Sequence, residues 1–335
     1  MDRIRDDGGF VRAGGDPVRV HGVDFSAAAN DAGRKTWIAS GTIDAGSDEL
    51  LVTELRSLAE LTGLDDDGGR GAGREDALPA LAAWIRTLDE RAVVGADFPF
   101  GLPRFVAEET GNESWRSVIS EFPESIGVGG AAGGAGERDD GGDGDEPDGT
   151  GDPVRAFAER CVGLTERYGE GTYDKRRTDA AVGARSPYGF IADTIAFYGM
   201  RDVLAPVADD VRFAPMDLAG QGWRPEAPPG PTVVETYPAA VLDRLGLCRT
   251  NYKGGGESAA TRRRRNAEGL VEEAAVVYKS GTGLADSMVA DAGGDALDAV
   301  AACVGAFGAW ERSYETDAAA FDDPDAVALE GYIYA

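Results

Sequence analysis

The sequence predicts an α/β fold built around a mixed five-stranded sheet with flanking helices. Three apolar, β-branched runs follow one another closely between residues 18 and 55, as the strands of an antiparallel meander do. Two further apolar runs, at 92–97 and 232–235, alternate with segments of helical periodicity. With 335 residues, of which 42% are hydrophobic, the chain is long enough to enclose a large core.

The first three strands are expected at 18–25, 35–40 and 50–55. Their connections are short and contain Asn30, Asp31, Gly33 and Gly46, which are residue types that favour tight turns. Residues 1–16 are polar and rich in glycine, and we expect them to form a flexible leader. The rest of the chain, 17–335, is expected to be a single domain.

The middle of the chain contains one predicted helix, one buried strand and two insertions. Leu78, Leu81 and Ile85 recur at helical spacing and predict a helix over 76–90, before the strand at 92–97. Residues 127–152 are glycine, acidic residues and alanine with little to bury, which predicts a disordered acidic insertion. Asp152 and Pro153 are typical of a helix start and open a predicted helical insertion over 153–210.

The last third supplies the fifth strand and the remaining helices. The strand at 232–235 precedes a helix that begins at Pro238, a polar helix over 257–278, and an apolar helix from Asp295 to Trp310. Residues 332–334 predict a closing strand. This order of elements is that of the ribonuclease-H-like fold. Its sheet order is 3-2-1-4-5, with the first, fourth and fifth strands parallel neighbours.

Composition and charge exclude several classes of protein. The chain has 33 basic and 60 acidic residues, a net charge of −27, and only four lysines, which is typical of a halophilic, archaeal protein. The single histidine, His21, excludes a zinc site with several imidazoles, and alternation along the first strand places it on the face opposite Asp24. No apolar run reaches the roughly 18 residues of a membrane span, and the first residues are not typical of a signal peptide, so we expect a cytoplasmic protein.

Acidic residues follow three strands that the predicted sheet order makes neighbours. Asp24, Asp97 and Glu235 stand at the carboxyl ends of these strands, and Asp295 and Asp298 share one face of the last helix. Carboxylates this close repel one another, and a divalent cation would remove the repulsion. Hard oxygen ligands without imidazole or thiolate favour Mg²⁺ or Mn²⁺.

Each carboxylate also has a structural interpretation, which is weakest for Asp298. Asp24 can belong to a turn, Asp97 can brace the proline-containing turn that follows it, and Glu235 can favour the start of the helix at Pro238. Asp295 is a candidate N-cap of the last helix. Asp298 lies at the third helical position but stands among alanine, leucine and valine, which favours a structural role less.

Four short motifs resemble those of the domain-of-unknown-function family 429, which is described as predicted nucleases of the ribonuclease-H-like superfamily. The motifs are Gly22-Val23-Asp24-Phe25-Ser26, the segment 95–102, Glu235-Thr236-Tyr237-Pro238, and Asp295-Ala296-Leu297-Asp298-Ala299. The last of them also resembles the Asp-x-x-Asp-Ala motif of RuvC-type resolvases. The second acid departs from the RuvC pattern, because it is an aspartate before a proline-flanked turn rather than a glutamate on a strand.

The resemblance implies hydrolysis of phosphodiester bonds by a two-metal mechanism. In that mechanism Asp24 bridges two Mg²⁺ or Mn²⁺ ions about 3.5–4 Å apart, one ion activating water and the other stabilising the leaving oxygen. The resemblance further implies that Glu235 and Asp298, with Asp97 or Asp295, complete the ligand sets.

A nucleic-acid substrate has to approach a chain of strongly negative charge, which repels phosphate. Two basic clusters, 175–177 and 262–265, oppose that charge, and Lys175, Arg177, Arg262 and Arg265 are the candidate phosphate contacts. Ion pairing with surface acids is the alternative for both clusters. Tyr252 and Lys253, before three glycines, lie in a predicted flexible loop that can reach a substrate.

Two other functions remain open from the sequence alone. The same fold serves nucleotide-binding and phosphotransfer proteins, although the connection over 26–33 is a poor phosphate-binding hairpin. A non-catalytic partner protein would keep its carboxylates for structure alone. The sequence does not distinguish DNA from RNA, nor does it predict an oligomeric state.

Overall fold

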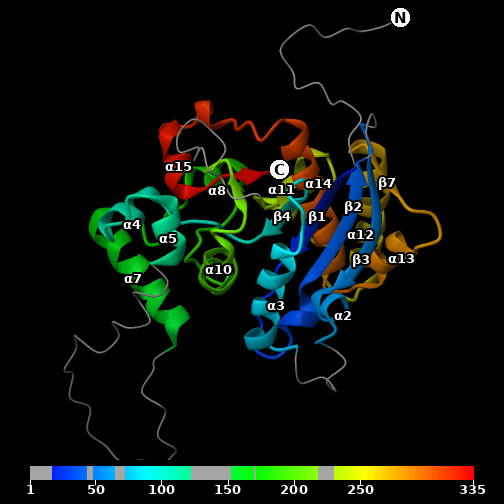
Figure 1. The fold of residues 1–335 in the computed structure, drawn as a ribbon, viewed down its shortest axis with the longest axis horizontal. Coiled ribbons are helices and arrows are strands. Elements are labelled where there is room, and N and C mark those ends of the chain that lie inside the picture. Colours follow the sequence, from blue (N-terminus) through cyan, green and yellow to red (C-terminus); the bar gives the residue numbers. More distant parts are fainter. Residues whose placement is uncertain (1–16, 44–47, 65–71, 122–151, 170, 218–229) are drawn as a thin grey trace, which may run out of the picture.

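The computed structural model describes residues 17–43, 48–64, 72–121, 152–169, 171–217 and 230–335. They form a mixed, mostly parallel sheet with helices on both faces (Figure 1). The leader expected over 1–16 and nearly all of the acidic insertion expected over 127–152 lie outside the described residues. The strands are β1 (Val18–Asp24), β2 (Trp37–Ile43), β3 (Leu50–Ser57), β4 (Val93–Asp97), β5 (Arg212–Ala214), β6 (Thr232–Thr236), β7 (Val276–Tyr278) and β8 (Ile333–Tyr334).

The sheet has more strands than the five expected, and its order differs from the predicted 3-2-1-4-5. Its order is β5-β6-β4-β1-β2-β3-β7, with β8 beside β6. The five expected strands are present in its centre as the neighbours β3-β2-β1-β4-β6, with β2 antiparallel to β1 and β3. The other strand pairs are parallel. Of the three additional strands, β8 is the closing strand expected over 332–334. The other two, β5 and β7, have only three residues each, too few for a periodic signal in the sequence.

Two hydrophobic cores lie on opposite faces of the sheet. On one face, Val23 and Phe25 share a core with Leu78 and Leu81 of helix α3 (Arg74–Arg86). On the other face, Val20 packs with helix α14 (Asp295–Glu311). Three further helices contribute to the α14 core, namely α11 (Pro238–Arg244), α12 (Glu257–Glu273) and α13 (Leu284–Ala290). The sheet thus separates an α3 face from an α14 face, and alternate strand residues point to one or the other.

Glycines let α14 lie directly on the central strands. A Cβ atom at Gly22 would overlap the backbone of Ala299 and Cys303, and one at Gly95 would overlap the carbonyl oxygen of Ala302. Close packing of this kind is one reason for glycine inside a strand. Because Asp298 is next to Ala299, the same contact sets the position of that carboxylate relative to β1.

A layer of helices extends the molecule beyond the edge of the sheet that β5 and β8 form (Figure 1). The helices that make up the layer are α4 (Arg104–Glu109), α5 (Trp115–Ser120), α7 (Pro153–Tyr168), α8 (Arg177–Val182), α9 (Ala192–Tyr198), the π-helical turn η2 (Gly199–Leu204), α10 (Ala205–Val207) and α15 (Val327–Glu330). The layer includes the segment expected as a helical insertion over 153–210. Asp152 caps α7 by accepting from the backbone N–H of Val154 at 3.1 Å, with Pro153 in the first turn, as the sequence predicts.

Several element boundaries differ from those expected. A short helix, α1 (Ala32–Lys35), occupies part of the first hairpin connection, so β2 begins at Trp37 and continues to Ile43. A second short helix, α2 (Leu58–Thr62), directly follows β3 and begins with a capping box at Ser57. The polar helix α12 ends at Glu273 rather than near residue 278, because the chain then enters β7 beside β3. Helix α3 ends at Arg86, short of the expected residue 90. Its Trp84 packs edge-on against His21 of β1.

Candidate functional site

Two carboxylates lie side by side where β1 and β4 end. Asp24 and Asp97 are partners in the parallel register of these strands. Both belong to the α14 face, because they alternate with Val23 and Ala96, which pack in the α3 core. Asp24 is 8% exposed. Burial raises the pKa of both carboxyls well above the usual range, and nearby negative charge raises it further.

Helix α14 brings two more carboxylates to the same edge. Asp298 is buried in its first turn, and burial raises its pKa, while Asp298 in turn raises the pKa of Asp24. Asp295 is the first residue of the helix and does not cap it. Asp291 instead accepts from the backbone N–H groups of Gly293 at 3.0 Å and Ala296 at 2.9 Å. The carboxylate of Asp295 is therefore left to face the site.

Lys253 supplies a positive charge among these carboxylates. Its Nζ lies 2.7 Å from Asp298 Oδ2 and 3.6 Å from Asp295 Oδ1. Burial acts to lower the pKa of Lys253, but Asp298 and Asp24 outweigh it and raise the pKa. The neighbouring Tyr252 donates its hydroxyl to Asp298 Oδ1 at 2.8 Å. Four carboxylates thus share one ammonium group, so the site keeps an excess of acidic groups.

The loop that carries Lys253 is held by an arginine that the sequence analysis did not single out. Arg263 of α12 is buried, and its Nη1 donates to the carbonyl oxygens of Tyr252 at 2.6 Å and Gly254 at 2.9 Å. Its Nε donates to the carbonyl oxygen of Val289 at 3.0 Å. One guanidinium thus holds the backbone on both sides of Lys253, although three glycines follow Lys253 in the sequence.

Glu235 lies on the opposite face of the sheet from Asp24 and Asp97. Ala96, not Asp97, is its partner in the register of β4 and β6. Its carboxylate pairs with the fully buried Arg176 at 2.7 Å and accepts from the backbone N–H of Phe100 at 3.0 Å. Glu235 still raises the pKa of Asp97, so it is near the site. The structure does not bring it into contact with the other carboxylates.

Thr236 is the residue of β6 that shares the face of Asp97. Its methyl group lies near the Cα positions of Gly95 and Gly305, against α14. Its hydroxyl is buried and has no hydrogen-bond partner among the described residues. The sequence analysis quoted Thr236 only as part of a motif, because the strand register that sets its face is not visible in the sequence.

The predicted phosphate contacts occupy different environments. Arg177 pairs with Asp322, Asp323 and the buried Glu330, as the ion-pairing alternative expects. Lys175 is exposed at the start of the same segment. Arg262 and Arg265 both lie on α12, where Arg265 is exposed and Arg262 half-buried. Of the cluster 262–265, Arg263 is the member that reaches the loop of the carboxylate site.

The chemistry of the donors fits a divalent cation, but their positions do not form a ligand shell. Carboxylate oxygens with a surplus of negative charge are the ligands that Mg²⁺ and Mn²⁺ prefer. Within the described part of the chain, however, no three His, Cys, Asp or Glu side chains converge as metal ligands would. The ammonium of Lys253 contacts Asp298 in the place where a cation would neutralise it. A cation that binds Asp298 together with its neighbours has to displace that ion pair.

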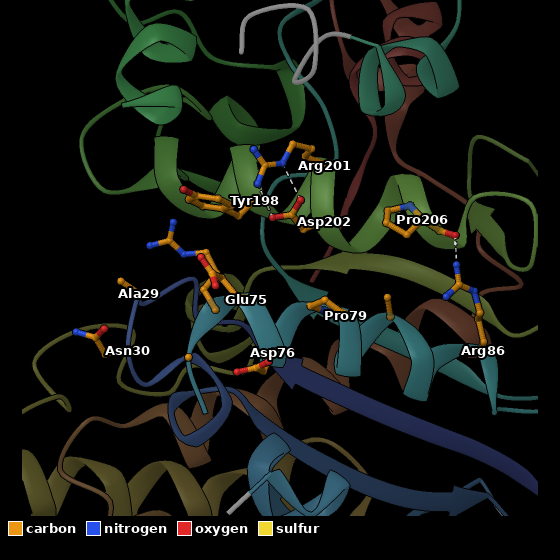
Figure 2. Close-up of a pocket in the computed structure, with 13 residues that line it drawn as sticks. Ala29, Asn30, Glu75, Asp76, Pro79, Arg86, Tyr198, Arg201, Asp202 and Pro206 are labelled. Atoms are coloured by element: carbon orange, nitrogen blue, oxygen red, sulfur yellow. Dashed lines mark hydrogen bonds and ion pairs between the residues drawn. The ribbon is translucent and has the colours of Figure 1, made fainter. Parts of the chain in front are cut away.

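A cavity of about 880 Å³ lies elsewhere, between α3 and the η2 segment (Figure 2). Its three arginines contact protein groups. Arg201 pairs with Asp202 at 2.7 Å, Arg86 pairs with Asp210 at 2.7 Å, and the guanidinium of Arg74 stacks on Tyr198 at 3.9 Å. The lining contains three basic and three acidic residues, so the cavity has no surplus of formal charge.

Comparison with protein-family models, with curated proteins and with solved structures gave no match for this chain. Among the described helices, none has the length and apolar character needed to cross a membrane.

Proposed function

We propose that the chain is a divalent-cation-dependent hydrolase of phosphodiester bonds, with nucleic acid as its substrate. The observation that carries the proposal is the meeting of Asp24, Asp97, Asp295 and Asp298 at one edge of the sheet. The carboxyl ends of parallel strands are where open α/β sheets bind ligands. Burying several acids with one ammonium group costs stability, which favours a functional over a structural role.

The arrangement of the central strands adds support. The neighbours β3-β2-β1-β4-β6 correspond to the order 3-2-1-4-5 expected of a ribonuclease-H-like sheet, and Asp24 and Asp97 stand at the ends of β1 and β4. The motifs that resemble family 429 include the segments that carry Asp24, Asp97 and Asp298. The proposed fold family and the proposed chemistry are therefore consistent with each other.

Asp24, Asp97 and Asp298 are the residues that would hold Mg²⁺ or Mn²⁺, with Asp295 at the edge of the site. When bound, such ions lower the pKa of water and neutralise charge on the leaving oxygen. Tyr252 orients Asp298 through its hydroxyl, and Lys253 neutralises the carboxylates. Once released from Asp298, the ammonium of Lys253 is free to contact a phosphate oxygen. Glu235 contributes indirectly, by fixing Arg176 and the turn that follows Asp97.

The first test is cation binding, measured as the shift of the unfolding temperature on addition of Mn²⁺ or Mg²⁺. We expect a clear upward shift for the wild-type protein in molar potassium chloride, since ligands of the native state stabilise it. Asp24→Asn should abolish the shift. Asp286→Asn removes the same charge at an exposed position of α13 and should keep it. An equal shift in both variants would contradict the proposed site.

The second test is cleavage of labelled single-stranded, duplex and branched DNA and RNA under the same conditions. We expect cleavage by the wild-type protein and by Asp286→Asn, and loss of cleavage in Asp24→Asn and in a chelated sample. If Mn²⁺ binds through Asp24 but none of these substrates is cut, the site binds a cation and the nuclease assignment fails.

A further inference from the structure

A small apolar cavity opens directly beside the carboxylate site. It measures about 190 Å³, and Asp97 is among its lining residues. The ion-paired Arg176, Asp179 and Glu235 also line it, together with Arg185 and Thr236. Most of the remaining lining side chains are apolar and come from the turn after β4, from the start of α9, from the residue after β6 and from β8. They include Phe98, Pro99, Ile191, Ile195, Tyr237 and Ile333. Because Asp97 belongs to both the carboxylate site and the lining of the cavity, a ligand held at the carboxylates would lie next to this cavity.

The rim of the cavity exposes hydrophobic surface that the fold leaves uncovered. Ile191 is 64% exposed and the adjacent Phe190 is 78% exposed, the two largest values among the exposed large hydrophobic residues described. The backbone of Ile191 has φ +75°, a conformation that is rare for a β-branched residue. Such strained conformations cluster at binding sites. Both features favour a rim that contacts a ligand.

One polar group of the cavity lacks a partner. Thr236 lines it, and the buried Oγ1 of this residue has no hydrogen-bond partner among the described residues. Buried hydroxyls without a partner are uncommon in native proteins. A heteroatom of a ligand in the cavity would provide one if the Thr236 side chain turned its hydroxyl from the protein interior to the cavity.

We infer that this cavity receives one unpaired nucleobase of the substrate, next to the phosphate held at the carboxylates. Apolar cavities of roughly 150 Å³ accept a benzene ring, so the present cavity is suited to one planar ring system. A base is planar, has ring and exocyclic heteroatoms, and is joined to its phosphate by a single sugar. It therefore matches the size of the cavity, its largely apolar walls and its position beside Asp97.

The inference rests on the proposed function and narrows its substrate class. A base can enter the cavity only after it has left its stack and its pairing partner, which costs least in single strands, loops and damaged sites. We therefore expect the protein to prefer substrates with at least one unpaired nucleotide at the scissile position.

The experiment places one abasic site at each position in turn along a labelled ten-nucleotide single strand and measures binding by fluorescence anisotropy in Ca²⁺. Contacts between bases and side chains are worth about fivefold or more in affinity. We expect one abasic position to weaken binding to the wild-type protein at least about fivefold, with little effect elsewhere. Ile191→Ser and Thr236→Val should bind the intact strand more weakly and lose the dependence on that position.

Val271→Ser, at an exposed hydrophobic residue of α12, serves as the matched control and should behave as the wild-type protein does. Equal affinity for every abasic strand, or a position effect that survives in both cavity variants, would overturn the inference. If cleavage and the Mn²⁺ shift persist in that case, the proposed function stands without the cavity. If no strand binds and no Mn²⁺ shift is seen, both proposals fail together.

Discussion

Replacing Arg176 by methionine tests whether Glu235 belongs to an ion-pair network rather than to the carboxylate site. The guanidinium of Arg176 is fully buried and binds Asp179 and Glu235, each through hydrogen bonds of 2.7 Å. Methionine keeps most of the volume of the side chain and removes its charge. Two buried carboxyl groups would then face each other without a cation.

The expected loss of stability follows from this geometry. Removing one partner of a buried ion pair costs about 3–5 kcal/mol, because the remaining charge is buried without compensation. The entropy of unfolding is about 2.1 cal/mol/K per residue. For a chain of 335 residues, the unfolding temperature should therefore fall by about 4–7 °C.

The assay is calorimetric unfolding between pH 5 and 7.5, with Arg155→Met as the control. Arg155 pairs with Glu159 on the surface of α7, where both side chains are more than half exposed, so its loss should not change the unfolding temperature measurably. Burial raises the pKa of Glu235 even beside Arg176. An acid whose pKa is raised by folding stabilises the native state at low pH, and this stabilisation is lost as the pH rises. The deficit of Arg176→Met should therefore be larger at pH 7.5 than at pH 5.

The reasoning is refuted if Arg176→Met lowers the free energy of unfolding by less than about 1 kcal/mol, which is the range of an exposed ion pair. A large loss that does not depend on pH would also refute it, because the two carboxyl groups would then not be buried together. Either result would leave Glu235 available to the carboxylate site.

Three other variants test the framework of the site. Gly22→Ala should destabilise the protein by about 1–3 kcal/mol in chemical denaturation, because α14 has no room for a Cβ, whereas Gly163→Ala, with open space on α7, should not destabilise it. Burial lowers the pKa of His21 from 6.5 to about 4. As the pH falls from 6.5 to 4, the free energy of unfolding of the wild-type protein should therefore decrease by about 3 kcal/mol more than that of His21→Gln. Parallel stability profiles of the two proteins over this pH range would contradict this. Arg263→Met should speed amide hydrogen exchange over residues 250–256, and unchanged exchange would show that the arginine does not hold that loop.

The central strands and the positions of Asp24 and Asp97 could be predicted because both are local properties. A short run of strand-forming residues that ends on an acid is visible within eight residues of sequence, as at 18–24 and 92–97. Asp298 could also be predicted, since an aspartate among apolar helical residues is seldom buried without a partner or a function. The expected position of His21 on the other face is confirmed by its contact with Trp84 on the α3 face.

The remaining parts of the site depend on contacts between distant residues. The face of Glu235 is set by the register of β6 against β4, and a shift of one residue would have placed it beside Asp97. Arg176 and Arg263 belong to basic clusters that are typical of surfaces, and only the packed structure shows that both are buried. Lys253 reaches Asp298 from 45 positions away, with no periodicity to indicate it.

The contacts around Arg176 also constrain when the molecule can be completed during synthesis. The guanidinium donates to the carbonyl oxygen of Glu330, and the backbone N–H of Ile333 donates to Thr178 at 2.8 Å. A nascent chain stalled after α14 would already contain the four site carboxylates and the strands that carry them. It would still lack the segment that ties the helical layer to β6. The helical layer can therefore reach its final contacts with β6 only after residues 330–334 have left the ribosome.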